Sequence, residues 1–202
     1  NRAALGAVYW LYVAQFLNEE KIIPDSAFAE YKKKIDEKFE LSVKETIDEK
    51  TSQYKEHGSF TLHYHIVEAY MVLAYGSFTN NEYYLNLARK MTDVVNTLEA
   101  EDGFLDAQIG HRPSGIGAQG YLIAGALNLY FKNQEQAQKF FNYPYGDRFF
   151  KDAKYPNRLV WYDTAMQNPN EFNDDISFVN MAELARVLFD GKEVRIELGE
   201  IK

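Results

Sequence analysis

The chain has 202 residues, of which 46% are apolar and 26% charged, so it can form one well-packed globular domain and is not expected to be disordered. It contains no cysteine, which excludes a disulfide framework, a thiolate zinc site and a cysteine nucleophile. Its formal net charge of −8 opposes contact with phosphate backbones, so we expect no nucleic-acid partner.

The first predicted element is a strongly apolar helix over residues 3–17. This helix is too short to span a membrane, so we expect no membrane partner. Because no small-residue cleavage site follows it, we interpret it as a buried core helix rather than a remnant of a signal peptide. The chain begins with Asn1 instead of Met, so we expect that it has been processed or trimmed. A soluble protein in a secreted or periplasmic location is compatible with such processing, and the compartment stays open.

The next two predicted elements are helices of different character. Apolar residues recur at steps of three and four over 26–54, with lysine and glutamate between them, which predicts a long amphipathic helix. Residues 60–75 are apolar on nearly all sides, which predicts an inner helix. Gly76 is predicted to close this helix, and Thr79 and Glu82 are predicted to form a capping box for the next one. The loop between them is short, so the two helices should pack antiparallel.

The second half of the chain is predicted to contain three more helices and a terminal strand. A loop over 99–115 precedes a helix rich in glycine and alanine over 116–131 and a short helix from Asn133 to Phe141. An irregular segment over 142–173 then leads to a helix over 174–191 and a strand-like tail over 191–202. The recurring pair of an inner apolar and an outer amphipathic helix predicts a single all-α domain over 1–202. Its antiparallel helical hairpins would resemble part of an α/α toroid, and an oligomer or a partner chain is a candidate for completing the array.

The segment over 62–70 holds the strongest candidates for chemistry. His65 and Glu68 are three residues apart and share a helix face, so the carboxylate can orient the imidazole and raise its basicity. His63 points elsewhere unless the helix begins at His65. The alternative is that both histidines close the core and bond to neighbouring backbone. Their spacing is not that of a zinc-binding helix, so we predict no metal and no other cofactor.

A resemblance to a known family rests on this segment. His63-Tyr64-His65-Ile66-Val67-Glu68-Ala69-Tyr70 resembles the His-x-His-Ile-x-Glu-Ala-Tyr helix of the N-acylglucosamine and cellobiose 2-epimerase family. Two later stretches, Asn81-Glu82-Tyr83-Tyr84-Leu85 and Ala88-Arg89-Lys90, are similar to the hairpin continuation of six-hairpin sugar enzymes. The resemblance implies an α/α toroid of hairpins in which pairs of histidines move a proton at C2 of a reducing-end sugar.

A second group of candidates lies in the predicted loop. Asp102 and Asp106 are carboxylates four residues apart, and with His111 they are candidates for a general acid/base set. His111 and Arg112 precede a predicted helix start, which suits a carboxylate or a hydroxyl-rich ligand. The alternative is that Asp102 forms a turn with Gly103 and Asp106 caps that turn.

A third group is aromatic. Nine aromatic side chains between residues 140 and 162 alternate with charged ones. Trp161 and Tyr162, with Tyr64 from the histidine segment, are predicted to bind substrate, because aromatic faces stack on sugar rings. The alternative is a loop that is held in place by its own aromatic side chains.

Two functional hypotheses follow from these groups. The leading one is a carbohydrate-active or carbohydrate-binding domain, with a saccharide or another small polar ligand as its partner. If it is an enzyme (an epimerase, a hydrolase or a lyase), His65 is the base, Glu68 orients it, and His111 or Asp102 is the acid. The rival hypothesis is a non-catalytic helical module that binds a protein partner. Burial of His65 in the core against backbone partners would favour the rival.

Overall fold

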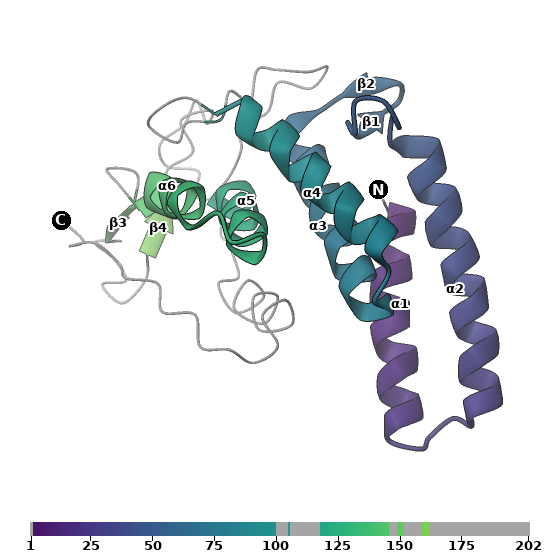
Figure 1. Cartoon of the computed structure of the whole chain (residues 1–202). Coiled ribbons are helices and arrows are strands. Elements are labelled where there is room, and N and C mark those ends of the chain that lie inside the picture. The colour runs from purple at the N-terminus through teal and green to yellow at the C-terminus, as the bar shows by residue number, and fades with distance from the viewer. Residues whose placement is uncertain (1, 100–104, 106–117, 146–148, 152–158, 162–202) are drawn as a thin grey trace. The chain divides into compact units, whose positions relative to one another are not determined.

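The computed structural model describes residues 2–99, 105, 118–145, 149–151 and 159–161 (Figure 1). Its elements are α1 (Arg2–Glu19), α2 (Asp25–Thr46), β1 (Lys55–Glu56), β2 (Ser59–Phe60), α3 (Leu62–Thr79), α4 (Glu82–Thr97), α5 (Ala118–Tyr130), α6 (Gln134–Tyr145), β3 (Phe149–Lys151) and β4 (Leu159–Trp161). This predominance of helix confirms the predicted all-α class. The predicted helix over 174–191 and the strand-like tail over 191–202 lie outside the described residues.

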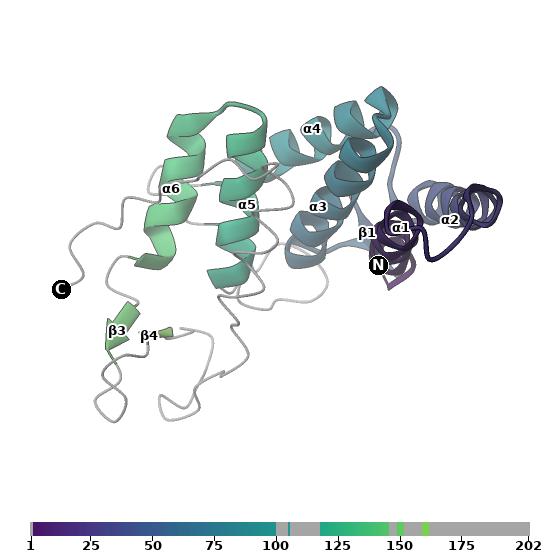
Figure 2. The ribbon, with the colours of Figure 1, turned by 90° about the horizontal axis from the view of Figure 1, so that it is seen from below.

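The chain divides into two compact units, Asn1–Met91 and Thr92–Lys202, with the boundary inside α4. In the first unit α1 and α2 lie side by side as a helical hairpin, and α3 packs against α1 (Figures 1 and 2). In the second unit α5 and α6 form another hairpin. None of the helices in the described ranges is long and apolar enough to cross a membrane.

Helix α1 is a helix as predicted, but it is not a buried one. Small side chains make most of its buried stripe, at steps of three and four residues: Ala4, Ala7, Leu11 and Ala14. Large apolar side chains on its other sides are about half exposed or more: Leu5, Tyr9, Trp10, Tyr12 and Phe16. The prediction of burial was wrong because an all-round apolar sequence does not say how many faces have a neighbour. Among the described residues, only one face of α1 is fully covered.

Helix α2 ends at Thr46 rather than near residue 54 as predicted. Ile47 has extended backbone angles and forms an isolated β-bridge with Tyr54. Between them the Asp48 carboxylate accepts the backbone N–H groups of Lys50 and Thr51, at 3.0 and 2.9 Å. This Asx-type turn satisfies backbone donors locally, so it competes with another helical turn and stops α2.

Helix α3 is the inner helix that its apolar sequence predicts. Leu62, Ile66, Val72 and Leu73 are all at most 1% exposed. In contact with it, the Phe39 ring of α2 stacks on the Tyr75 ring with centroids 3.7 Å apart, and the Tyr75 hydroxyl donates to the Asp36 carboxylate. The Tyr75 hydroxyl therefore has its hydrogen-bond acceptor on α2.

The junction between α3 and α4 differs from the prediction in two details. Helix α3 continues past Gly76 to Thr79, and Asn80, in the left-handed region at φ 50°, closes it. A Cβ atom at Gly76 would lie 2.9 Å from the backbone nitrogen of Leu85, so glycine permits the close approach of the two helices. Asn81, rather than Thr79, caps α4 by accepting the Tyr83 N–H at 3.0 Å. Gly76 lies against Leu85 and His65 lies against Met91, which is the order of contacts expected for the predicted antiparallel packing.

In the second unit the predicted helix start at Asn133 is confirmed. Its side-chain oxygen accepts the Gln136 N–H at 3.4 Å, and α6 then runs to Tyr145 rather than to Phe141. A Cβ atom at Gly125 of α5 would meet the Phe141 ring at 2.4 Å, which explains why α5 needs a small residue there. The segment over 142–173 was predicted to be irregular, but it contains the antiparallel pair β3–β4, in which Phe149 pairs with Trp161.

A pair of amides joins α4 to α5. Asn128 is buried, and each of the two side chains, Asn96 and Asn128, donates to the other, at 2.9 and 3.0 Å. The Asn128 amide also donates to the Ala124 carbonyl oxygen at 2.9 Å. Because every donor of the buried amide has an acceptor, this polar pair can fix the register of the two helices without the cost of an unpaired group.

Candidate functional site

His65 has no exposed surface, and both of its ring nitrogens bond to backbone. Nδ1 lies 3.0 Å from the backbone nitrogen of Tyr54 and accepts its proton, because that N–H can only donate. The neutral ring must then carry its own proton on Nε2, which donates to the carbonyl oxygen of Met91 at 2.9 Å. Through these two hydrogen bonds, the ring connects the start of α3 to the segment before β1 and to α4.

This environment does not fit the base role that was predicted for His65. Burial lowers the pKa of His65 to about 4, although the bond to Met91 raises it in part. A proton could be accepted only at Nδ1, and that atom is already occupied by the Tyr54 N–H. The observed arrangement is the alternative stated from the sequence, a core histidine that bonds to neighbouring backbone.

Glu68 does not orient His65, because both nitrogens of that ring bond elsewhere. Its carboxyl group is fully buried, and neither oxygen has a hydrogen-bond partner in the described part of the chain. Burial raises the pKa of Glu68 to about 7. The protonated, neutral form is favoured, since an unpaired buried charge is costly.

His63 and Tyr64 are half-buried. The two rings meet edge to face at 5.5 Å, and His63 Nδ1 has no hydrogen-bond partner in the described ranges. Burial lowers the pKa of His63. His63 and Glu68 are five residues apart on α3 and so lie on different helix faces, which means that the histidine segment forms no single catalytic group.

The remaining predicted site residues cannot be placed with these. Asp102, Asp106, His111, Arg112 and Tyr162 lie outside the described residues, and only the backbone of Trp161 is described, as the end of β4. Their predicted roles stay predictions. Within the described ranges there is no group of three or more histidine, aspartate or glutamate side chains that could hold a metal ion.

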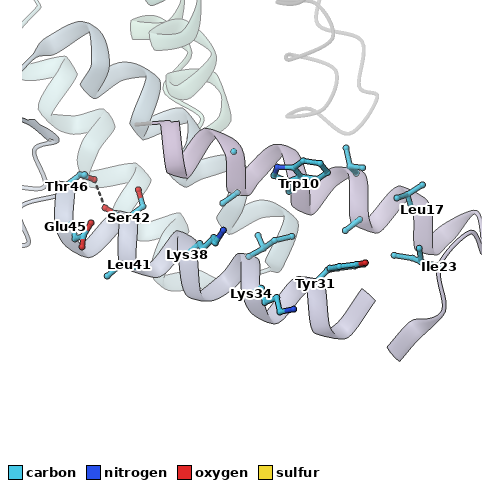
Figure 3. Close-up of a pocket in the computed structure, with 15 residues that line it drawn as sticks. Trp10, Leu17, Ile23, Tyr31, Lys34, Lys38, Leu41, Ser42, Glu45 and Thr46 are labelled. Carbon is cyan, nitrogen blue, oxygen red and sulfur yellow. Dashed lines mark hydrogen bonds between the residues drawn. The ribbon is translucent and has the colours of Figure 1, made fainter. Parts of the chain in front are cut away.

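An apolar groove lies between α1 and α2, with a volume of about 950 Å³ (Figure 3). Helix α1 lines it with Gly6, Ala7, Trp10, Val13, Ala14 and Leu17, and α2 lines it with Tyr31, Lys34, Ile35, Lys38, Leu41, Ser42, Glu45 and Thr46. Ile23 closes the end near the turn between the helices. The groove follows both helix axes, so its shape suits an elongated ligand.

The sequence explains why this groove is open. Three of the six α1 side chains that line it are glycine or alanine, which leave space beside α2. Large apolar groups remain at its edges, where Trp10 is 61% exposed, Tyr31 50% and Leu41 55%. Single exposed apolar residues are common on proteins, but a contiguous set that lines a groove is typical of an interaction site.

A second cavity, between α2 and α4, is more polar and has a volume of about 740 Å³. Its buried floor is formed by Val43, Ile47, Ser52, Tyr84 and Leu87. Its exposed rim is formed by Glu40, Lys44, Glu49, Asn81, Tyr83, Asn86 and Lys90. The two lysines balance the two glutamates, so the rim favours a neutral polar ligand over an ion.

Sequence reasoning missed both cavities. The signal for the apolar groove was present: α2 carries Tyr31, Lys34, Lys38, Leu41 and Glu45 on one face, at steps of three and four. It was overlooked because α1 was expected to be covered on all sides. No protein-family model, curated protein or solved structure matches the chain.

Proposed function

We propose that this chain is a non-catalytic helical interaction module whose α1–α2 groove binds an amphipathic helix of a partner protein. The observation that supports the proposal is the apolar groove with its exposed aromatic edges, Trp10 and Tyr31. Tryptophan and tyrosine are enriched among the residues that carry binding energy at protein interfaces. The burial of His65 removes the strongest argument for chemistry at the histidine segment.

The length of the groove suits a helix. Its lining extends from Gly6 to Leu17 on α1 and from Tyr31 to Thr46 on α2, which at 1.5 Å per residue is about 16–23 Å, or three to four helical turns. A helix that presents apolar residues at i, i+3, i+4 and i+7 over that length would cover Trp10 and Leu41. The bound helix would add one more helix to the array that α1, α2 and α3 already form.

Fluorescence of Trp10 provides the experiment. The chain has two tryptophans, so the full-length Trp161→Phe variant leaves Trp10 as the single reporter. The probe is a stapled 16-residue helix with leucine at the four anchor positions, glutamine elsewhere and no aromatic residue. We expect a saturable blue shift of Trp10 emission as the peptide removes the ring from water.

A matched pair of variants localises the binding. Tyr31→Ala removes an aromatic ring that lines the groove, while Tyr12→Ala removes an equally exposed ring of α1 that does not line it. We expect Tyr31→Ala to weaken binding at least tenfold and Tyr12→Ala to change it little. Equal effects, or no shift at all, contradict the proposal. A shift that appears on raising the protein concentration without peptide identifies a second copy as the occupant and also contradicts it.

The polar cavity between α2 and α4 favours a second candidate function, which is saccharide binding. Its mostly apolar buried floor with a rim of charged and amide side chains is the pattern of small-ligand sites, and the exposed Tyr83 ring can stack on a sugar. Thermal shift with glucose, N-acetylglucosamine and cellobiose tests this candidate. The candidate is supported if sugar raises the melting temperature of the parent chain and of Tyr31→Ala but not of Tyr83→Ala. It is ruled out if no sugar changes the melting temperature at millimolar concentration.

A further inference from the structure

The ionisable side chains that line the apolar groove come from α2 alone. The α1 side contributes only glycine, alanine, valine, leucine and tryptophan. The α2 side contributes Tyr31, Lys34, Lys38 and Glu45. Lys34 and Lys38 lie one helical turn apart near the middle of the groove, and Glu45 lies towards one end (Figure 3). The centre of the groove is therefore positive in a chain whose net charge is −8.

The two lysines differ in how they are held. Lys34 Nζ bonds to the Glu30 carboxylate at 2.6 Å, and both side chains are exposed, so water screens the pair and little is lost if it opens. Lys38 has no ion-pair partner among the described residues, so its charge is available. A ligand carboxylate can bind Lys38 directly and share Lys34 with Glu30.

Two acidic residues near the middle of α2, Asp36 and Glu40, face away from the groove. Asp36 accepts hydrogen bonds from Tyr75 and from Lys32, on the side of α2 that meets α3. Glu40 belongs to the rim of the polar cavity between α2 and α4. Although α2 has acidic and basic residues in similar number, its periodic spacing places both Lys34 and Lys38 on the groove face, with Glu45 as the acidic side chain in the lining.

We propose, on the basis of the function proposed above, that the groove selects an acidic amphipathic helix, one that carries two carboxylates spaced four residues apart at positions outside its apolar anchors. Carboxylates spaced by one turn match the spacing of Lys34 and Lys38 when the bound helix runs along the groove. A basic helix with the same apolar face would place like charges together. The apolar anchors supply most of the affinity, and the charges supply the choice of partner.

Three stapled peptides test this selection. They share the leucine face of the probe above and differ only at two non-anchor positions four residues apart, which are glutamate, glutamine or lysine. Binding is measured by Trp10 emission in the Trp161→Phe chain. We expect the order glutamate, glutamine, lysine, with about a three- to thirty-fold difference between the extremes at low salt, since two exposed ion pairs are each modest. At about 1 M salt the three affinities should converge.

A pair of lysine variants identifies the residues that select. Lys38→Gln should reduce the ratio of glutamate-peptide to lysine-peptide affinity several-fold. Lys33→Gln, an exposed lysine of α2 outside the groove lining, should leave that ratio nearly unchanged. Equal affinities for the three peptides, or equal effects of the two variants, overturn the acidic selection while helix binding stands. Failure of every peptide to bind contradicts the proposed function itself.

Discussion

Nε2 of His65 lies 2.9 Å from the carbonyl oxygen of Met91, and this bond connects the inner helix α3 to α4 across 26 residues of sequence. The same ring accepts the backbone N–H of Tyr54. A single side chain thus satisfies two backbone groups from separate segments, which defines a structural rather than a catalytic role.

Replacement of His65 should therefore lower stability. His65→Ala leaves the Tyr54 N–H and the Met91 carbonyl without this partner and opens a cavity, so we expect the free energy of unfolding to fall by about 2–5 kcal/mol. His63→Ala is the control, because His63 is half-buried and its Nδ1 has no partner among the described residues. Urea denaturation of both variants measures the difference. A loss at His65 no larger than at His63 would contradict the structural role.

The low pKa of His65 predicts acid sensitivity. The folded chain holds the ring neutral down to a pKa of about 4, whereas the unfolded chain takes up the proton near 6.5. Because the unfolded state then binds more protons, stability should fall as the pH is lowered from about 6.5 to about 4, by on the order of 3 kcal/mol. The measurement is urea denaturation across this range, and in His65→Gln this part of the pH dependence should be absent.

Glu68 should act with the opposite sign at higher pH. Its folded-state pKa of about 7 is above its unfolded value of about 4.5, so the folded state binds the proton more tightly. Its contribution is complete below pH 4.5 and is lost as the pH rises through 7, by on the order of 3 kcal/mol. Glu68→Gln keeps the shape without the charge, so it should gain stability relative to the parent chain between pH 5 and pH 8. A difference that does not change with pH would contradict the raised pKa of Glu68 in the folded chain.

Two glycines should respond differently to the same substitution. Gly76→Ala brings a methyl group to 2.9 Å from the Leu85 backbone, so α3 and α4 must separate and stability should fall by about 1–3 kcal/mol. Gly6→Ala, in α1, meets no atom within 4 Å and should stabilise the chain by about 0.5–1 kcal/mol through its higher helix propensity. Thermal melting distinguishes the two. Equal shifts would disprove the close approach at Gly76.

The amides of Asn96 and Asn128 should be energetically coupled. Asn96→Ala leaves part of the buried Asn128 amide unpaired, and Asn128→Ala leaves the half-buried Asn96 amide without its partner. Each variant should therefore lower the free energy of unfolding by about 1–3 kcal/mol. The double variant should cost less than the two single variants added, by about 0.5–2 kcal/mol. A double-mutant cycle in urea measures this coupling. Strict additivity would mean that the two amides do not interact in solution.

Patterns between sequence neighbours determined the all-α class, the inner helix over 60–75 and the helix start at Asn133. Each of these depends on residues within one or two turns, where helix periodicity and capping act. The end of α2 was predicted less well, because the turn at Asp48 stops the helix although the helical spacing of apolar residues continues in the sequence. There the prediction failed at the boundary and not in the type of element.

The roles of individual polar residues were decided only by the tertiary structure. His65 and Glu68 are close in sequence on one helix, yet the bonds of His65 go to Tyr54 and Met91, which are 11 and 26 residues away. The same holds for α1, whose apolar sequence made it a helix but did not say which of its faces would be covered. Periodicity fixes which side chains share a face, while burial and hydrogen bonding depend on what the rest of the chain places against that face.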